Sequence, residues 1–300
     1  MAREIVECIP NFSEGRRKDV VDGIAGAIRS VSGVRVLDVE TDANHNRAVI
    51  TFIGDRTAVA EAAFRGARVA VERIDLTVHR GEHPRIGALD VCPFVPISGV
   101  TMEDCVALAR SVGERIAREL SVPVYLYEEA ATRPDRRALP DIRKGEFEGL
   151  REEIKTNPDR APDFGRPEVH PTAGATVVGA RAHLIAFNVN LGTRDVRIAK
   201  SIAKAVRESD GGLKFVRAKG FDLKDRGIVQ VSMNMTNYAA TPLFRAYEMI
   251  KSEAARWGAP IVGTEIVGLV PLAALVDVAD FYLKLENFKT SQILETRLWE

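Results

Sequence analysis

The chain has 300 residues, 46% of them hydrophobic, the composition of a folded globular protein with one large core or two smaller ones. Its 42 lysines and arginines equal its 42 aspartates and glutamates, so no net positive field favours nucleic acid or an anionic membrane surface. Cys8, Cys92 and Cys105 show no C-x-x-C spacing, and the N-terminus lacks a signal-peptide pattern. We therefore expect a cytoplasmic protein without a disulfide framework.

Hydrophobic periodicity predicts the first half in the order β-α-β-β-α-β, followed by one more helix and strand. The expected strands are Ile5–Phe12, Val34–Glu40, Ala48–Ile53, Val91–Ile97 and Val122–Tyr127, and the expected helices are Ser13–Ser30, Asp55–Ile74 and Thr101–Leu120. Periodicity disappears from Ala130 to Ala175, except for a short helix near Glu146–Ile154. Such a long loop is usually functional or a linker. We place a domain boundary near Val178, which gives subdomains at 1–178 and 179–300.

The second half repeats the β-α-β-β-α-β order and adds a helix. Its expected strands are His183–Leu191, Leu213–Phe221, Ile228–Met235 and Ala259–Val267, and its expected helices are Asp195–Glu208, Pro242–Trp257 and Pro271–Leu283. We interpret the apolar run Ile261–Leu283 as soluble core, because a membrane span with three acids is costly. The prediction is an α/β (α+β) fold with two ferredoxin-like-ordered subdomains, each a mixed sheet with helices on one face.

The segment from His79 to Ile97, HRGEHPRIGALDVCPFVPI, holds the densest polar chemistry of the chain. Gly81 and Pro84 break regular structure, and Pro84 disfavours helical angles at His83. His83 is therefore expected in a turn, where an imidazole can act as an acid/base catalyst. The main alternative is a loop whose histidines have no catalytic role.

The same segment also matches H-x-x-E-H, from His79 to His83, the pattern of an inverted zinc-protease helix. That chemistry needs both histidines on one regular helix, and Gly81 and Pro84 make such a helix unfavourable. No phosphate-binding glycine motif and no G-x-S-x-G occurs. These observations argue against a zinc hydrolase, nucleotide chemistry and serine hydrolysis.

Two strands of the second half alternate apolar residues with amides. Asn188 and Asn190 share one face of their strand, as do Gln230, Ser232 and Asn234 of another. Such a face can recognise a heterocycle or an amide through hydrogen bonds; the alternative is an ordinary solvent-exposed sheet face. The remaining polar clusters carry weaker signals: the turn DANHNR at 42–47 needs no function, and His170 and His183 are expected to be structural.

Seven blocks resemble the glutamate formimidoyltransferase family, in order and with similar spacing over almost the whole chain. They are ECIPNFSEGR (7–16), GEHPRIGALDVCPFVPI (81–97), VPVYLYEEA (122–130), APDFG (161–165), GAR–LIAFNVNLGT (179–193), QVSMN (230–234) and VGLVPLAAL (267–275). The resemblance implies transfer of the formimino group from N-formimidoyl-L-glutamate to N5 of tetrahydrofolate, a step of histidine breakdown. It also implies two α/β subdomains and a homodimer.

The resemblance assigns residues as well. The family's catalytic histidine falls on His83. Its folate-binding segment falls on Gly165, Arg166, Pro167, Glu168, Val169, His170, Pro171, Thr172, Ala173 and Gly174. Our own reasoning adds Arg47 and Arg85 as ligands for substrate carboxylates, and Asn188 and Asn190 as lining residues. Glu40 is a hypothetical acid that orients His83, although relatives often have Asp there. The co-substrate is tetrahydrofolate, and the chemistry requires no metal.

Three alternatives stay open. A related transferase could use N-formyl-glutamate and make 5-formyltetrahydrofolate, the protein could be a folate carrier without turnover, or it could be a zinc hydrolase. Vertebrate-type members carry a cyclodeaminase domain after this one, whereas this chain stops at Glu300. A separate cyclodeaminase is therefore expected to use the product.

Overall fold

A computed structural model describes residues 4–298. Its internal contacts divide the chain into two compact units, with the division between Arg181 and Ala182. The boundary expected near Val178 falls inside a strand of the first unit. Each unit has its own sheet and its own hydrophobic core.

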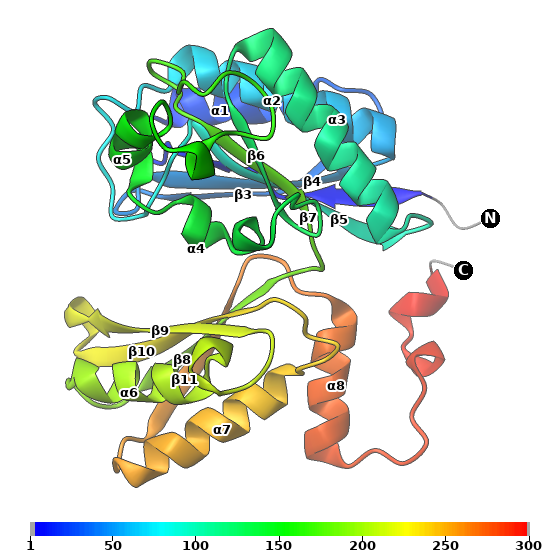
Figure 1. Ribbon diagram of the computed structural model, residues 1–300. Coiled ribbons are helices and arrows are strands. Elements are labelled where there is room, and N and C mark those ends of the chain that lie inside the picture. The colour runs from blue at the N-terminus through cyan, green and yellow to red at the C-terminus, as the bar shows by residue number, and fades with distance from the viewer. Residues whose placement is uncertain (1–3, 299–300) are drawn as a thin grey trace. The chain divides into compact units, whose positions relative to one another are not determined.

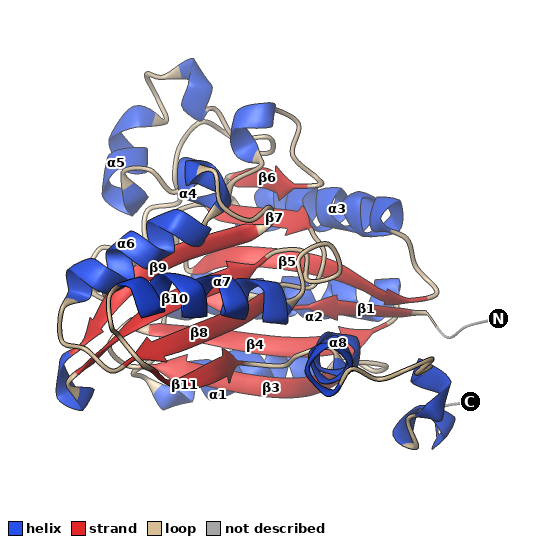
Figure 2. Ribbon diagram, turned by 90° about the horizontal axis from the view of Figure 1, so that it is seen from below, coloured by secondary structure: helices blue, strands red, loops and turns tan. Residues whose placement is uncertain are grey.

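The first unit is built on a seven-stranded mixed sheet. Its strands are β1 Ile5–Cys8, β2 Asn11–Phe12, β3 Arg35–Asp42, β4 Arg47–Gly54, β5 Leu89–Ser98, β6 Val124–Glu128 and β7 Thr176–Ala180. Figure 2 shows these strands side by side from β6 at one edge to β3 at the other. Strands β3, β4, β1/β2 and β5 have the neighbour order of a ferredoxin-like sheet, and β7 and β6 extend it.

Three long helices cover one face of this sheet: α1 Lys18–Arg29, α2 Arg56–Arg73 and α3 Met102–Leu120 (Figure 1). Local sequence sets their starts. The Asp55 carboxylate accepts the Ala58 N–H at 2.8 Å, and Thr101 and Asp104 form a capping box at α3. The long segment between β6 and β7 holds the short helices α4 Leu139–Ile142 and α5 Glu146–Glu153, and the 3-10 turns Pro134–Arg136 and Pro158–Arg160.

Two expectations for this unit were wrong. First, α1 begins at Lys18 and not at Ser13, because the Ser13 hydroxyl donates to the Gly87 carbonyl at 2.7 Å instead of capping a helix. Second, β7 was not expected, yet it lies between β5 and β6 and pairs parallel with both. All five residues of β7 are buried, so its sequence has no alternation that would have marked it as a strand.

The second unit has four strands, β8 Ile185–Leu191, β9 Val216–Leu223, β10 Ile228–Met235 and β11 Ile261–Val267, in the order β11-β8-β10-β9. This is the ferredoxin-like order, and helices α6 Val196–Val206 and α7 Leu243–Arg256 cover one face (Figure 1). The predicted α/β class with two subdomains is confirmed. One detail differs: every pairing in this sheet is antiparallel, so the sheet is not mixed.

The apolar run Ile261–Leu283 forms β11 and the helix α8 Leu272–Leu283. The interpretation of this run as core is wrong, because Ala274 is the one buried residue of α8. Phe281, Tyr282 and Leu283 are 46%, 45% and 68% exposed. Within residues 4–298, no helix is both long and apolar enough to cross a membrane.

Candidate active site

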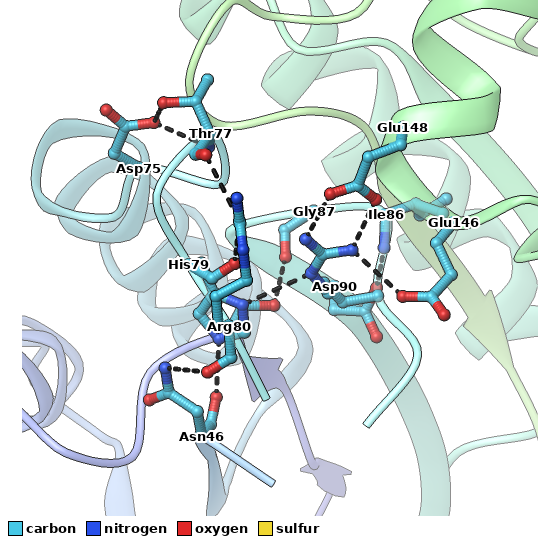
Figure 3. A network of polar contacts seen from close by, with 12 residues as sticks. Asn46, Asp75, Thr77, His79, Arg80, Ile86, Gly87, Asp90, Glu146 and Glu148 are labelled. Carbon is cyan, nitrogen blue, oxygen red and sulfur yellow. Dashed lines mark hydrogen bonds and ion pairs between the residues drawn. The ribbon is translucent and has the colours of Figure 1, made fainter. Parts of the chain in front are cut away.

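Three loops of the first unit meet at Asn46. The Asn46 side chain accepts the Gly15 N–H at 3.0 Å and donates to the Arg80 carbonyl at 3.0 Å. Its backbone carbonyl accepts a hydrogen bond from Nε2 of His79 at 2.9 Å (Figure 3). Asn46 holds the left-handed φ of 49° that this residue type tolerates. One hairpin residue therefore fixes the loop that carries both histidines of the H-x-x-E-H pattern.

His79 has a structural environment. It is buried, its Nε2 bonds the Asn46 carbonyl, and its Nδ1 accepts from Nε of Arg85 at 3.3 Å. Burial lowers the pKa of His79. Residues 79–85 form a loop and not a helix, as expected, so His79 and His83 do not share the helix face that an inverted zinc-protease motif needs.

His83 has a different environment. It is partly exposed, and it lies in the loop directly before Pro84. Burial, followed by the charges of Arg47, Arg143 and His45, lowers the pKa of His83 to about 2. The imidazole is therefore neutral near pH 7. A neutral imidazole has one ring nitrogen with a lone pair, and this nitrogen can accept a proton.

A second imidazole lies beside it. The rings of His45 and His83 are 6.3 Å apart between centroids and nearly perpendicular. His45 Nδ1 and Asp42 Oδ2 are 2.8 Å apart, and this contact lowers the pKa of Asp42 although burial opposes it. The sequence pattern of the turn at 42–47 gave no indication of a function. In the structure, this turn places the Asp42–His45 pair beside His83.

Arg85 was predicted to bind a substrate carboxylate, but the chain itself supplies its partners. Its guanidinium donates twice to Glu148, at 2.8 Å for each bond, and once to Glu146 at 3.0 Å. Both glutamates belong to α5 (Figure 3). The pairing raises the pKa of Arg85 and lowers that of Glu148 to about 2. Arg85 is thus fully engaged in holding α5 against the loop.

The segment from Gly165 to Gly174 runs into the loop that follows His83. The Ala88 N–H donates to the Ala173 carbonyl at 2.9 Å, and the Ala175 N–H to the Ile86 carbonyl at 2.8 Å. Residues 165–168 are exposed, whereas Val169, Ala173 and Gly174 are buried. The structure therefore brings the expected folate segment to the His83 loop, with its first residues open to solvent.

Gly174 permits this close approach. Its φ is +71°, and a Cβ at this position would collide with the Ile86 carbonyl oxygen. The His170 ring accepts the Ala173 N–H at 3.0 Å, so this imidazole shapes the turn of the segment. Burial lowers the pKa of His170.

The remaining expected residues lie farther along the sheets. Glu40 is on β3, opposite Val49 of β4, and its charge acts on Arg47. Its role as a partner that orients His83 stays a hypothesis. Asn188 and Asn190 belong to the second unit. Asn188 donates to Glu265 at 3.1 Å, Asn190 accepts from Gln230 at 2.9 Å, and the buried Oδ1 of Asn188 has no hydrogen-bond partner within residues 4–298.

Sequence reasoning missed two residues of the site. Arg143 forms an ion pair with Asp90, and both side chains are almost fully buried. Asp90 also accepts the Ile86 N–H at 2.8 Å. The sequence did offer one signal for Arg143. Segment 131–150 is basic and interrupted by prolines, and its arginines were not assigned to any predicted helix. Asp90, but not Arg143, lines a narrow recess beside His83 that is too small to admit a water molecule; the other lining residues are Phe12, Ser13, His45, Asn46, Arg47, His79 and Arg85.

Comparisons with known proteins show the family to which this chain is related. The formiminotransferase domain, N-terminal subdomain, matches residues 5–181, and the formiminotransferase domain matches residues 186–297. The chain is 52% identical to a glutamate formimidoyltransferase of Streptococcus pyogenes and 55% identical to one of Thermoplasma acidophilum. These alignments cover 98% of this chain and 99% and 97% of the two relatives.

A third relative, the formimidoyltransferase-cyclodeaminase of Gallus gallus, is 48% identical over 95% of this chain. The chain spans 53% of that longer protein. Because two family models match most of the chain and relatives about half identical align with nearly all of it, the chain belongs to the formiminotransferase family.

Proposed function

We propose that this protein transfers the formimino group from N-formimidoyl-L-glutamate to N5 of tetrahydrofolate. Family membership over both units and the two full-length relatives named glutamate formimidoyltransferase support this activity. The observation that carries it is His83, a neutral imidazole in the loop that abuts the expected folate segment. A folate-dependent transferase needs a proton acceptor at that position.

The bond changes are simple. The N5 amine adds to the amidine carbon, and the bond between that carbon and the glutamate nitrogen breaks. N5 loses a proton and the departing glutamate amine gains one, so one base that accepts and then returns a proton balances the reaction. General acid–base assistance of this kind typically contributes about a hundred- to ten-thousand-fold. Holding two substrates together supplies much of the remaining acceleration.

His83 fits this role, because its imidazole is neutral and one ring nitrogen carries a lone pair. Asp42 and His45 lie next to it and offer a second, more exposed imidazole. We assign Gly165–Gly174 to folate binding. Asn188 and Asn190 remain candidate substrate contacts, and the support is that the buried Oδ1 of Asn188 has no hydrogen-bond partner within residues 4–298. A homodimer completes the proposal.

The test mixes purified protein with tetrahydrofolate and, in separate reactions, N-formimidoyl- and N-formyl-glutamate, with mass spectrometry of the folate products. Formimino transfer that is lost in His83→Ala supports the reaction and the residue. Transfer from the formyl donor alone would make the protein a glutamate formyltransferase instead. Folate binding without product from either donor would indicate a carrier and contradict the proposal.

A further inference from the structure

Asp42 and His45 form a carboxylate–imidazole pair on the turn between β3 and β4. His45 Nδ1 lies 2.8 Å from Asp42 Oδ2, and Asp42 Oδ1 accepts the backbone N–H groups of Asn44 and His45, at 2.8 Å each. Burial opposes ionisation of Asp42, but these hydrogen bonds lower its pKa nonetheless. Because an ionised carboxylate can only accept, the proton of a neutral His45 ring lies on Nδ1, and Nε2 carries the lone pair.

The turn is held closely against the loop that carries His83. The Glu82 N–H donates to the Asn44 carbonyl at 3.3 Å. Gly81 lies so near that a Cβ at this position would collide with the His45 carbonyl oxygen. These backbone contacts involve the residues directly before His83 and the residues at His45. They therefore set the spacing of the two imidazoles, whose ring centroids are 6.3 Å apart with an angle of 71° between the ring planes.

Both imidazoles are accessible, although the recess that they share is closed. The His45 side chain is 46% exposed, and His83 is partly exposed. The recess lined by both residues is too small to admit a water molecule. A substrate therefore meets the two rings at their solvent-exposed edges and not inside the recess.

The proposed transfer moves protons at two different nitrogens. N5 of tetrahydrofolate loses a proton, and the glutamate nitrogen gains one. Both nitrogens are bonded to the same carbon in the intermediate, so two rings with centroids 6.3 Å apart can each reach one of them at a hydrogen-bond distance of about 2.6–3.2 Å. His83 can accept the first proton. It is poorly suited to carry the second, because burial and the nearby positive charges hold its pKa at about 2.

We propose that His45, oriented by Asp42, is the general acid that protonates the departing glutamate nitrogen, while His83 is the base that deprotonates N5. This inference rests on the proposed function and deepens it, since it assigns one imidazole to each reacting nitrogen. The geometric basis is the Asp42–His45 contact, the fixed spacing of the two rings and their shared access to solvent.

The steps balance without a further reactant. N5 forms its bond to the amidine carbon and gives its proton to His83. The electron pair of the carbon–nitrogen double bond moves to the formimino nitrogen and then re-forms that double bond. As it does so, the bond from the carbon to the glutamate nitrogen breaks, and this nitrogen keeps the electron pair and takes the Nε2 proton of protonated His45. Passage of a proton from His83 to His45, directly or through solvent, returns both rings to their starting states.

The first experiment measures transfer from N-formimidoyl-L-glutamate to tetrahydrofolate with and without added imidazole. His45→Ala should lower kcat by about a hundredfold or more and leave both KM values within a few-fold of wild type. Free imidazole should restore the kcat of this variant by about tenfold or more, because the vacated position is exposed to solvent and a dissolved acid can replace the missing one. Asn44→Ala, at an exposed position of the same turn, is the matched control and should keep the wild-type kcat with or without imidazole.

A second variant tests the orienting role of Asp42. Asp42→Asn keeps an oxygen that can accept the two backbone N–H groups of the turn, but its amide does not hold the His45 proton on Nδ1. The kcat should fall by about tenfold or more, because the wrong tautomer presents no proton acceptor on the solvent side. Nitrogen-15 NMR of the neutral His45 ring should show the proton on Nδ1 in wild type and a shift of population toward Nε2 in Asp42→Asn.

Three outcomes overturn the inference alone. A His45→Ala variant with nearly wild-type kcat would mean that His83 handles both protons. A loss in His45→Ala that imidazole does not relieve would mean that the residue supports the turn and supplies no proton. An unchanged His45 tautomer in Asp42→Asn would remove Asp42 from the mechanism. Absence of transfer by the wild-type protein from either donor would instead refute the proposed function, and this assignment with it.

Discussion

The loop from His79 to Asp90 has two sides that differ in how completely their charges are paired. On one side, which we call the closed side, Arg85 is hydrogen-bonded to Glu146, Glu148 and His79, and each polar group of the network has a partner. On the other side, which we call the open side, His83 has a ring nitrogen with a lone pair, and the buried Nε of Arg47 has no hydrogen-bond partner among residues 4–298. Folding alone explains the first side. Folding alone does not explain the open side, because a buried N–H without a partner is costly.

The largest expected difference between the two sides concerns catalysis. His83→Gln should lower kcat by about a hundred- to ten-thousand-fold, because it removes the proton acceptor and keeps a side chain of similar size. His79→Gln should instead lower the free energy of unfolding, since it disturbs two buried hydrogen bonds of the closed side. Turnover and urea unfolding, measured on both variants, check this. If a well-folded His79→Gln variant lost as much turnover as His83→Gln, the distinction between a structural His79 and a catalytic His83 would be wrong.

The closed side also depends on a backbone contact. Gly174→Ala should lower the free energy of unfolding by about 3 kcal/mol or more, because a Cβ at φ +71° collides with the Ile86 carbonyl. Gly26→Ala in α1 is the control: nothing lies within 4 Å of the added Cβ, so the variant should gain up to about 1 kcal/mol. Denaturant midpoints measure both. A Gly174→Ala protein as stable as wild type would mean that the loop and the folate segment are not held this closely.

The open side predicts a pH effect of intermediate size. The unfolded chain protonates residue 83 below about pH 6.5, whereas the folded protein holds its pKa at about 2. Below pH 6.5 the unfolded state therefore binds more protons, and stability falls with acidification by about 1.4 kcal/mol per pH unit, or about 2 kcal/mol at pH 5. Unfolding of wild type and His83→Asn at pH 7.5 and pH 5 tests this. The wild-type loss should exceed the variant's by about 2 kcal/mol, and equal losses would mean that folded His83 titrates normally.

Features of the fold and site that depend on local sequence could be predicted, whereas those that depend on contacts between residues far apart in the chain could not. Strand β10 occupies the predicted residues Ile228–Met235, because alternation and turn signals are local. Strand β7 was missed, because a short strand buried on both faces shows no alternation. The position of His83 in a loop was predictable from Pro84. Its neighbour Arg143 was not, since only the fold brings α4 to the loop.

The two predicted carboxylate ligands, Arg47 and Arg85, show the same limit. Both are arginines in polar, turn-rich segments, and nothing local separates them. The difference is that Glu146 and Glu148, more than sixty residues later, bind Arg85, whereas the buried Nε of Arg47 has no partner among residues 4–298. A sequence can propose a cation for a site, but whether the chain satisfies that cation is decided by tertiary structure.

The last and smallest expected effect tests this distinction directly. Arg85→Met should lower the free energy of unfolding by about 1–2 kcal/mol, a modest loss because Glu146 and Glu148 are half exposed and return to water. The KM for the donor should stay within a few-fold of wild type. Arg133→Met, which removes a more exposed ion pair with Asp135, is the control and should change stability by less than about 0.5 kcal/mol. If Arg85→Met kept full stability but raised the donor KM tenfold or more, Arg85 would be a substrate ligand. Glu146 and Glu148 would then bind Arg85 only in the absence of the donor, and the donor carboxylate would replace them. The closed side of the loop would in that case belong to the binding site.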